Sequence, residues 1–279
     1  MLILPAAELL EAWEAGRDAS PGERGLILLG VACSGTPTAA LAEWPVGRRD
    51  AALLALFEQL FGPRLSAQAD CPHCSAALEM DFPVSTIIAP VPKPPSDRFV
   101  LECAGYRVIY RLPTTGDLAA MGKQTTILDD ESRITRWLLR RCVVQVEEVK
   151  GAGSPSRPMP ATEDAAAQEF SVALSDFPDP RANGIPDEVM AALETAISRT
   201  VASTDPLAEI ELKLNCPECT APWSAPFDIV SFLWNELDDW ASGILNQVHM
   251  LASNYGWSES EIVALSPQRR QHYQDLIGT

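Results

Sequence analysis

The tetrapeptides CPHC, at Cys71–Cys74, and CPEC, at Cys216–Cys219, decide how this sequence is interpreted. Strand-like stretches flank them, from Leu65 to Ala69 and from Ala77 to Phe82 around the first, and from Ala208 to Leu214 before the second. We therefore expect each tetrapeptide to form the turn of a two-stranded β-hairpin. The proline at the second position of both tetrapeptides stiffens the turn because its ring fixes φ.

The two cysteine pairs belong to an internal duplication. A shift of 145 residues superposes the second tetrapeptide on the first and also aligns residues outside it. The aligned pairs are Leu65 with Ile210, Pro72 with Pro217, Phe82 with Phe227, Val84 with Ile229, and Ile87 with Phe232. A shift of 137 aligns Asp50 with Asp187, in the helices expected before the two hairpins. The repeated unit is therefore a helix, a strand, CPxC, a strand and an apolar segment, and each copy carries half of a four-cysteine set.

Four cysteines in two CxxC pairs are typical of a structural zinc site. Zinc takes four ligands in a tetrahedron, with each thiolate sulfur about 2.3 Å from the ion, and one CxxC pair supplies two of them. We expect one shared Zn²⁺, a cofactor with a structural role, bound by Cys71, Cys74, Cys216 and Cys219. The sequence leaves open two separate sites, another metal or an iron–sulfur centre, and a redox role for the thiols.

No catalytic motif accompanies the cysteines. The sequence contains no P-loop, no glycine-rich dinucleotide turn, no HExxH and no GxSxG. Four thiolate ligands leave no open coordination position on the metal for water or substrate. We expect His73 to be exposed between two ligands, and His249 and His272 to be surface or packing residues. The sequence therefore predicts neither an enzyme nor a small-molecule substrate.

The predicted fold class is α+β and mostly helical. Its centre is a split zinc ribbon made of the two hairpins, flanked by N- and C-terminal helices and interrupted by a small hairpin-and-helix insertion. The predicted regions are N-terminal helices over 1–62, the first zinc hairpin over 63–89, an inserted hairpin and helix over 90–149, a proline-rich flexible insertion over 150–186, the second helix and zinc hairpin over 187–229, and C-terminal helices over 230–279.

Capping and turn signals place the individual elements within these regions. Helices are expected over 5–16, from Pro21 towards Cys33 with Ser20 as N-cap, and over 48–61, 130–142 and 187–200. A hairpin over 99–112 should turn near Ala104-Gly105, and the prolines over 90–95 predict a stiff linker.

The most regular helical pattern lies near the C-terminus. Its apolar stripe consists of Leu233, Leu237, Trp240, Ile244, Val248 and Leu251. Gly256 should end this helix, Ser258 and Glu261 should form a capping box for the next, and Pro267 should begin the last.

Large side chains on these helices could either pack in the core or face a partner protein. We expect Trp240 to be a core residue, whereas Trp234 lies off the centre of the stripe and could face a partner. The basic pairs Arg48-Arg49 and Arg269-Arg270 are expected at the surface.

Composition restricts the environment and the partners. The 279 residues include 21 basic and 38 acidic side chains, and the resulting charge of −17 disfavours nucleic acid as a ligand. No apolar run reaches the roughly 18 to 20 residues that a membrane span needs. Seven cysteines, four of them in CxxC pairs, fit a reducing compartment, so we expect a cytoplasmic protein with no membrane span. The other three, Cys33, Cys103 and Cys142, are expected to be core thiols.

Three segments carry a resemblance to a known family. They are PVGRRDAALLALFEQLFG from Pro45 to Gly62, CPECTAPWSAPFDIVSFLWNEL from Cys216 to Leu237, and VHMLASNYGWSESEIVALSPQRRQHYQDLIG from Val248 to Gly278. With CPHC after the first, they resemble zinc-ribbon-containing baseplate or hub-assembly proteins of contractile phage tails and phage-tail-like contractile injection systems. The resemblance implies a structural or assembly role, with other baseplate or hub proteins as partners. It carries over only the four cysteines, and the insertion over 150–186 departs from it.

Two functions remain open at this level. The first is a structural or assembly component of a baseplate, cytoplasmic or incorporated in a phage-tail-like particle. The alternative is a zinc-ribbon adaptor in transcription or RNA handling, which the charge of −17 opposes.

Overall fold

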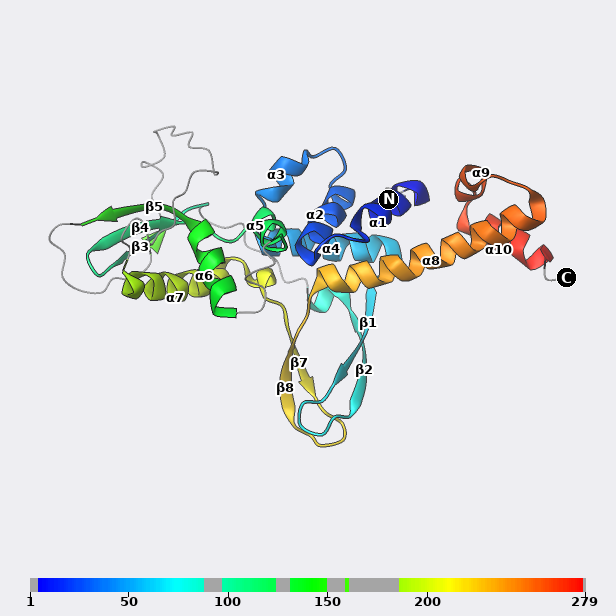
Figure 1. Ribbon diagram of the computed structural model, residues 1–279. Helices are drawn as coiled ribbons and strands as arrows, with labels where there is room; N and C mark the ends of the chain where they lie inside the picture. Colours follow the sequence, from blue (N-terminus) through cyan, green and yellow to red (C-terminus); the bar gives the residue numbers. More distant parts are fainter. Residues whose placement is uncertain (1–4, 88–96, 124–130, 150–158, 161–185, 278–279) are drawn as a thin grey trace.

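The computed structural model describes residues 5–87, 97–123, 131–149, 159–160 and 186–277. Within these residues the fold is α+β and mostly helical, with three small antiparallel sheets, so the α+β, mostly helical part of the predicted fold class is confirmed. Figure 1 shows a helical body, two hairpins that project from it on the same side, and a separate sheet with its own helices. The predicted linker over 90–95 and nearly all of the insertion over 150–186 lie outside the described residues.

The helical body is built from the N-terminal helices and one long helix near the C-terminus. They are α1 (Ala6–Gly16), α2 (Pro21–Ala32), α3 (Thr38–Ala42), α4 (Val46–Phe61) and α8 (Ile229–Tyr255). Ser20 caps α2, as predicted, and also forms a full capping box with Glu23. The first core includes Leu29, Leu53, Leu54, Leu65, Val84, Ile229 and Leu233, each fully buried. Both hairpins thus contribute to the same core through the residues at their bases.

The two hairpins follow the predicted duplication. Strands β1 (Arg64–Asp70) and β2 (Ala77–Pro83) form the first, and β7 (Glu211–Asn215) and β8 (Pro222–Pro226) form the second. Leu65 pairs with Phe82 in the first hairpin. At the equivalent place in the second, the Phe227 N–H donates to the carbonyl of Ile210 at 2.8 Å. A 3₁₀ turn (Val84–Thr86) follows the first hairpin, and another (Pro206–Ala208) precedes the second.

The inserted module is larger than the sequence indicates. The hairpin of β3 (Phe99–Cys103) and β4 (Tyr106–Tyr110), which turns at Ala104 and Gly105 as predicted, is joined by β5 (Val143–Glu148) and β6 (Met159–Pro160). The strand order is β5-β4-β3-β6. Helix α6 (Glu131–Cys142) and helix α7 (Asp187–Thr204) accompany this sheet.

Helix α7 packs in a different core from α4, although a shift of 137 aligns the two helices in sequence. Val189, Leu193 and Ile197 of α7 lie in a second core with Tyr110 and Leu139 of the inserted module. The chain therefore leaves the second core through α7 and returns to the first core at Leu207, before β7 begins.

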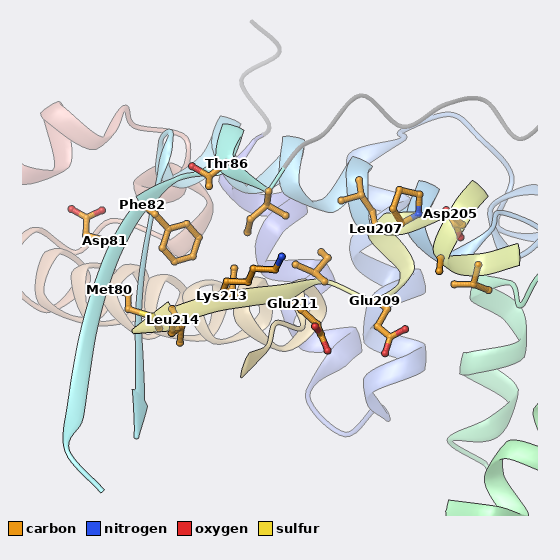
Figure 2. Close-up of a pocket in the computed structure, with 16 residues that line it drawn as sticks. Met80, Asp81, Phe82, Thr86, Asp205, Leu207, Glu209, Glu211, Lys213 and Leu214 are labelled. Atoms are coloured by element: carbon orange, nitrogen blue, oxygen red, sulfur yellow. The ribbon is translucent and has the colours of Figure 1, made fainter. Parts of the chain in front are cut away.

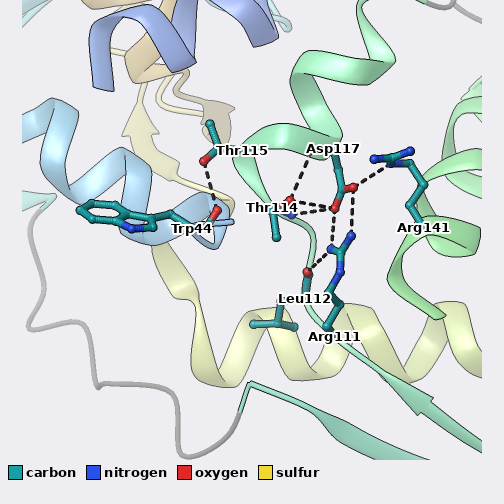
Figure 3. Close-up of polar contacts among 7 residues, drawn as sticks. All are labelled: Trp44, Arg111, Leu112, Thr114, Thr115, Asp117 and Arg141. Atoms are coloured by element: carbon teal, nitrogen blue, oxygen red, sulfur yellow. Dashed lines mark hydrogen bonds and ion pairs between the residues drawn. The ribbon is translucent and has the colours of Figure 1, made fainter. Parts of the chain in front are cut away.

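A short helix that the sequence did not reveal joins the two cores. Helix α5 (Thr115–Met121) carries Asp117, whose 1% exposed carboxylate accepts hydrogen bonds from Arg111 and Arg141 at 2.6 to 3.1 Å (Figure 3). On its other side the Thr115 N–H donates to the carbonyl of Trp44 at 2.9 Å. Paired charges of this kind fix the position of α5 between the sheet and the N-terminal helices.

The C-terminal helices fold back on the end of α8. Gly256 ends α8 in the left-handed region, at φ 69°, and Ser258 with Glu261 forms the predicted capping box of α9 (Glu259–Val263). Helix α10 (Pro267–Ile277) completes the described chain. The guanidinium of Arg270 hydrogen-bonds to Gln247 and to two carbonyl groups at the end of α9.

The surface prediction is wrong for Arg49 and Arg270, and Trp234, which the sequence left open as a residue that could face a partner, is buried. Arg270 is 5% exposed because of the bonds just described, and Arg49 is 5% exposed because its Nε lies 2.6 Å from the Asp50 carboxylate. Trp234 is also 5% exposed. It packs against Gly16, where a Cβ would collide with its ring, and the Arg24 guanidinium lies 4.5 Å from the ring centroid. The buried face of α8 is therefore wider than its stripe, since α1 and α2 cover it from a second direction.

Trp240 of α8 was expected in the core. It is half-buried and packs against the first core.

In the part of the chain that the structure describes, no helix is both long enough and apolar enough to cross a bilayer.

Candidate metal centre

Each CPxC tetrapeptide forms the same tight turn at the tip of its hairpin. In the first turn the Cys71 N–H donates to the carbonyl of Ala76 at 2.9 Å, and the Ser75 N–H donates to the carbonyl of Cys71 at 2.8 Å. In the second, 145 residues later, the Cys216 N–H donates to Ala221 at 3.1 Å and the Thr220 N–H to Cys216 at 2.9 Å.

The residue after each tetrapeptide has the same unusual backbone conformation. Ser75 has φ 59° and Thr220 has φ 62°, both in the left-handed region that residues other than glycine rarely adopt. Two segments so far apart in the chain therefore share both the hydrogen bonds and the strained residue of the turn. Backbone strain of this kind persists where surrounding interactions hold it, and it is common at ligand sites.

The two tips meet and bring all four predicted cysteines together. The Sγ atoms of Cys71 and Cys219 are 3.7 Å apart, and those of Cys74 and Cys216 are 3.6 Å apart. All four Sγ atoms lie within 4.8 Å of one another. Four sulfurs at about 2.3 Å from one tetrahedral ion would be about 3.8 Å apart. The sulfur cluster therefore has the size of a mononuclear metal centre, and the prediction that these four residues converge is confirmed.

The cluster lies at the surface on one side only. Cys71 and Cys216 are 1% and 2% exposed, Cys219 is half-buried and Cys74 is exposed. Leu78 packs against the buried side. The buried pair therefore contains the first cysteine of each turn, as expected for two turns related by approximate twofold symmetry.

Backbone and sulfur neighbours change the acidity of the thiols. The backbone N–H groups of Cys219 and Glu218 stabilise the Cys216 thiolate and lower the pKa of that thiol to about 7. The Ala76 N–H acts in the same direction on Cys74, but the neighbouring sulfurs, Cys216 first, together with partial desolvation raise the pKa of Cys74 to about 12. Adjacent thiolates repel each other, so the four cannot all ionise unless a cation compensates their charge. The donor set thus fits a thiophilic metal ion.

The three histidines take no part in the cluster. His73 is exposed between two ligands, as predicted, and His249 and His272 are exposed on α8 and α10. Among the described residues, no other group of three or more histidine, cysteine or acidic side chains is close enough to bind a metal.

The remaining cysteines belong to the two cores. Cys142 is fully buried, and burial raises its pKa to about 12. Cys33 and Cys103 are half-buried and pack against the first and second core, where burial raises the pKa of each thiol. The prediction of a core thiol is confirmed fully for Cys142 and in part for the other two.

Sequence reasoning missed a buried polar group at the base of the second hairpin. Asp205 is 4% exposed, and its carboxylate accepts a hydrogen bond from the Gly47 N–H at 2.9 Å. Nearby, burial raises the pKa of Asp50 to about 6, against the opposing effect of Arg49. In the sequence, the only indication of this contact between α4 and the turn before β7 was Asp50, an aspartate within the apolar face of α4.

Sequence reasoning also missed a pocket between the two hairpins. It has a volume of about 980 Å³ and lies between residues of β2, the turn before β7, and β7 itself (Figure 2).

Comparisons with known proteins give no identification. No family model, no curated protein and no solved structure matches this chain.

Proposed function

We propose that this protein is a zinc-stapled structural or assembly component of the baseplate of a contractile tail or injection system, and that it acts in the cytoplasm or within the assembled particle. The observation that carries the structural role is the convergence of four thiols from two hairpins that are 145 residues apart in sequence. A metal at this place joins distant parts of the chain.

The donor set supports a structural ion. Four cysteine ligands fill a tetrahedral shell and leave no position for a reacting water or carbonyl oxygen. Zn²⁺ suits four thiolates and has no preferred geometry that the cluster would oppose. A multi-iron cluster requires ligand sulfurs farther apart than the 4.8 Å limit within this group.

The baseplate part of the proposal is supported by the resemblance of the segments Pro45–Gly62, Cys216–Leu237 and Val248–Gly278 to that family. The first of these segments precedes the first hairpin, the second contains β8 of the second hairpin, and both contribute to the first core. The third forms the end of α8, α9 and α10. Partners are accordingly other baseplate or hub subunits.

The test combines metal analysis with co-purification. The tagged protein is expressed with the genes that neighbour its own, purified without added metal, and measured by elemental analysis and mass spectrometry. We expect one zinc per chain and a tail, sheath or hub protein in the complex. Zero zinc would refute the metal assignment. Tight, salt-sensitive association with RNA or DNA in place of tail proteins would favour the zinc-ribbon adaptor of transcription or RNA handling.

A further inference from the structure

The pocket between the hairpins runs along an unpaired strand edge. Its lining includes every residue from Glu209 to Leu214. Consecutive side chains of a strand point to opposite faces, so a pocket that touches all of them extends past the edge. β7 belongs to a two-stranded sheet, and no strand in the described part of the chain pairs with its second edge.

The alternation of hydrogen-bonded and non-hydrogen-bonded pairs in the β7–β8 hairpin shows which backbone groups of β7 face the open edge. The bond from the Phe227 N–H to the Ile210 carbonyl makes Ile210 a hydrogen-bonded position, and the register continues through Leu212. In an antiparallel ladder, hydrogen-bonded and non-hydrogen-bonded positions alternate. The N–H and C=O groups of Glu211 and Lys213 therefore point away from β8, towards the open edge.

The opposite edge of the same hairpin is blocked. Pro222 and Pro226 of β8 pair with Asn215 and Glu211, so they occupy the positions whose backbone faces outward. Proline has no N–H, and prolines at such positions prevent an edge from accepting another strand. The second hairpin is thus closed to pairing on its β8 side and open on the side that borders the pocket.

The side chains around the pocket define what it can bind. Met80 and Phe82 of β2 face Leu212 and Leu214 of β7 across it, and all four are only half-buried (Figure 2). Apolar side chains left in this state favour a ligand that covers them.

The charged residues at the rim are mainly acidic. Glu209 and Glu211 are exposed, and Asp81 adds a third carboxylate that is paired with Arg64. Lys213 is the one basic residue of the described lining. An extended segment with alternating apolar and basic residues is therefore complementary to this site in backbone, shape and charge.

We propose that β7 accepts an extended strand of a partner protein, which pairs with the backbone of Glu211 and Lys213, inserts apolar side chains between the hairpins and places basic side chains beside Glu209 and Glu211. This site deepens the proposed function and rests on it in one respect, because the metal at the tips holds the two walls of the pocket together. Strand binding and metal content are measured in separate experiments, so the proposed strand site and the proposed metal site can each be refuted without the other.

The probe is a labelled peptide, acetyl-Lys-Ile-Lys-Val-Lys-Ile-Lys-amide, titrated into the full-length protein and followed by fluorescence anisotropy. Two control peptides have the same composition. In one the four lysines precede the three apolar residues, and in the other the amides that would face β7 are N-methylated. We expect both controls to bind at least about tenfold more weakly, since each removes alternation or backbone pairing.

The matched variants change a single residue at the edge. Lys213→Pro removes an outward N–H without removing a bond to β8, whereas Lys213→Thr removes the same charge but keeps the N–H. We expect Lys213→Pro to weaken peptide binding at least about tenfold and Lys213→Thr to change it less than about threefold. The metal content and circular dichroism of both variants report whether the hairpin still folds.

Hydrogen exchange in the unmodified protein gives a readout that needs no variant. Saturating peptide should slow exchange of the Glu211 and Lys213 amides at least about tenfold. The Ala225 amide points towards β7 inside the hairpin, at the position paired with Leu212, so its exchange should not change. Equal binding to Lys213→Pro, or no slowing at these amides, would overturn the proposal. So would protection of both amides in the free protein. Protection independent of concentration would mean that another part of this chain fills the pocket, and concentration-dependent protection would mean that a second copy does.

Discussion

Gly47 and Asp205 lie in contact although 158 residues separate them, with the glycine N–H donating to the carboxylate at 2.9 Å. A Cβ at position 47 would collide with the carboxylate and with the backbone N of Ala208. This contact joins α4 to the turn that begins the second hairpin. No other residue type fits at position 47 without separating these two parts of the chain.

Substituting Gly47 therefore tests the joint. We expect Gly47→Ala to lower the free energy of unfolding by about 2 to 4 kcal/mol, measured by urea denaturation, because backbone or a buried carboxylate must move. Gly243→Ala is the matched control, since nothing lies within 4 Å of the added methyl group on α8. It should stabilise by about 0.5 to 1 kcal/mol through helix propensity. Similar effects at the two positions would contradict the assigned contact.

The raised pKa of Asp50 predicts an unusual pH dependence. Its folded-state pKa of about 6 exceeds the ordinary 3.8, so the folded protein binds this proton more tightly than the unfolded chain. The stabilisation is complete below about pH 4 and is lost as the pH rises through 6. Relative to the wild type, Asp50→Asn should therefore gain about 2 kcal/mol between pH 4.5 and 7.5.

The comparison of variants cancels the effects of other groups, including the lowered pKa of Asp117, which acts in the opposite direction at lower pH. Asp239→Asn, at an exposed position on α8, is the control for removing one carboxylate. If the free-energy difference for Asp50→Asn stays constant from pH 4.5 to 7.5, Asp50 does not titrate as described.

Removal of the metal should loosen the contact between the hairpins. We expect Cys71→Ser to lose the ion and to unfold about 10 °C lower, because a structural metal contributes at least about 3 kcal/mol in a domain of this size. Treatment of the wild type with a strong chelator should give the same result. Cys33→Ser, outside the cluster, should keep one ion and nearly the wild-type melting temperature. A chelator without effect on melting would contradict a structural metal.

Arg270 should control the attachment of the last two helices. Arg270→Ala removes hydrogen bonds to Gln247 of α8 and to the carbonyls of Val263 and Leu265. Loss of this buried, hydrogen-bonded guanidinium should lower the free energy of local opening of α9 and α10, measured by hydrogen exchange, by about 2 to 3 kcal/mol, with little change in α4. The exposed neighbour Arg269 provides the control, and Arg269→Ala should have almost no effect. Equal exchange in the two variants would refute this role.

The parts of the fold with local signals could be predicted from the sequence. The two hairpins, their turns and the convergence of Cys71, Cys74, Cys216 and Cys219 follow from the repeated CPxC unit and from the tetrahedral demand of a shared ion. Ser20, Gly256 and Ser258 marked helix ends correctly because caps depend on a few adjacent residues.

Features that depend on distant partners could not be predicted in this way. Arg270 is a charged residue whose burial requires Gln247 and helix-end carbonyls supplied by the folded chain. Arg49 is buried beside Gly25 of α2, a neighbour that only the folded chain supplies. Trp234 is buried because α1 crosses it at Gly16. β5 begins directly after α6 with no turn residue between them, so the sequence offers no boundary there. The sequence also did not show that α7 packs in the second core, because that packing depends on the inserted module.

The separation of the two hairpins along the chain also has a consequence for synthesis. Ribosomes add roughly 5 to 20 residues per second, so Cys71 and Cys74 emerge roughly 7 to 30 s before Cys216 and Cys219. During that interval the first turn presents two thiols of a four-thiol site, and the base of its hairpin lacks the α8 residues that complete the first core. The nascent chain therefore passes through a stage in which neither the ion nor the core can secure the first hairpin.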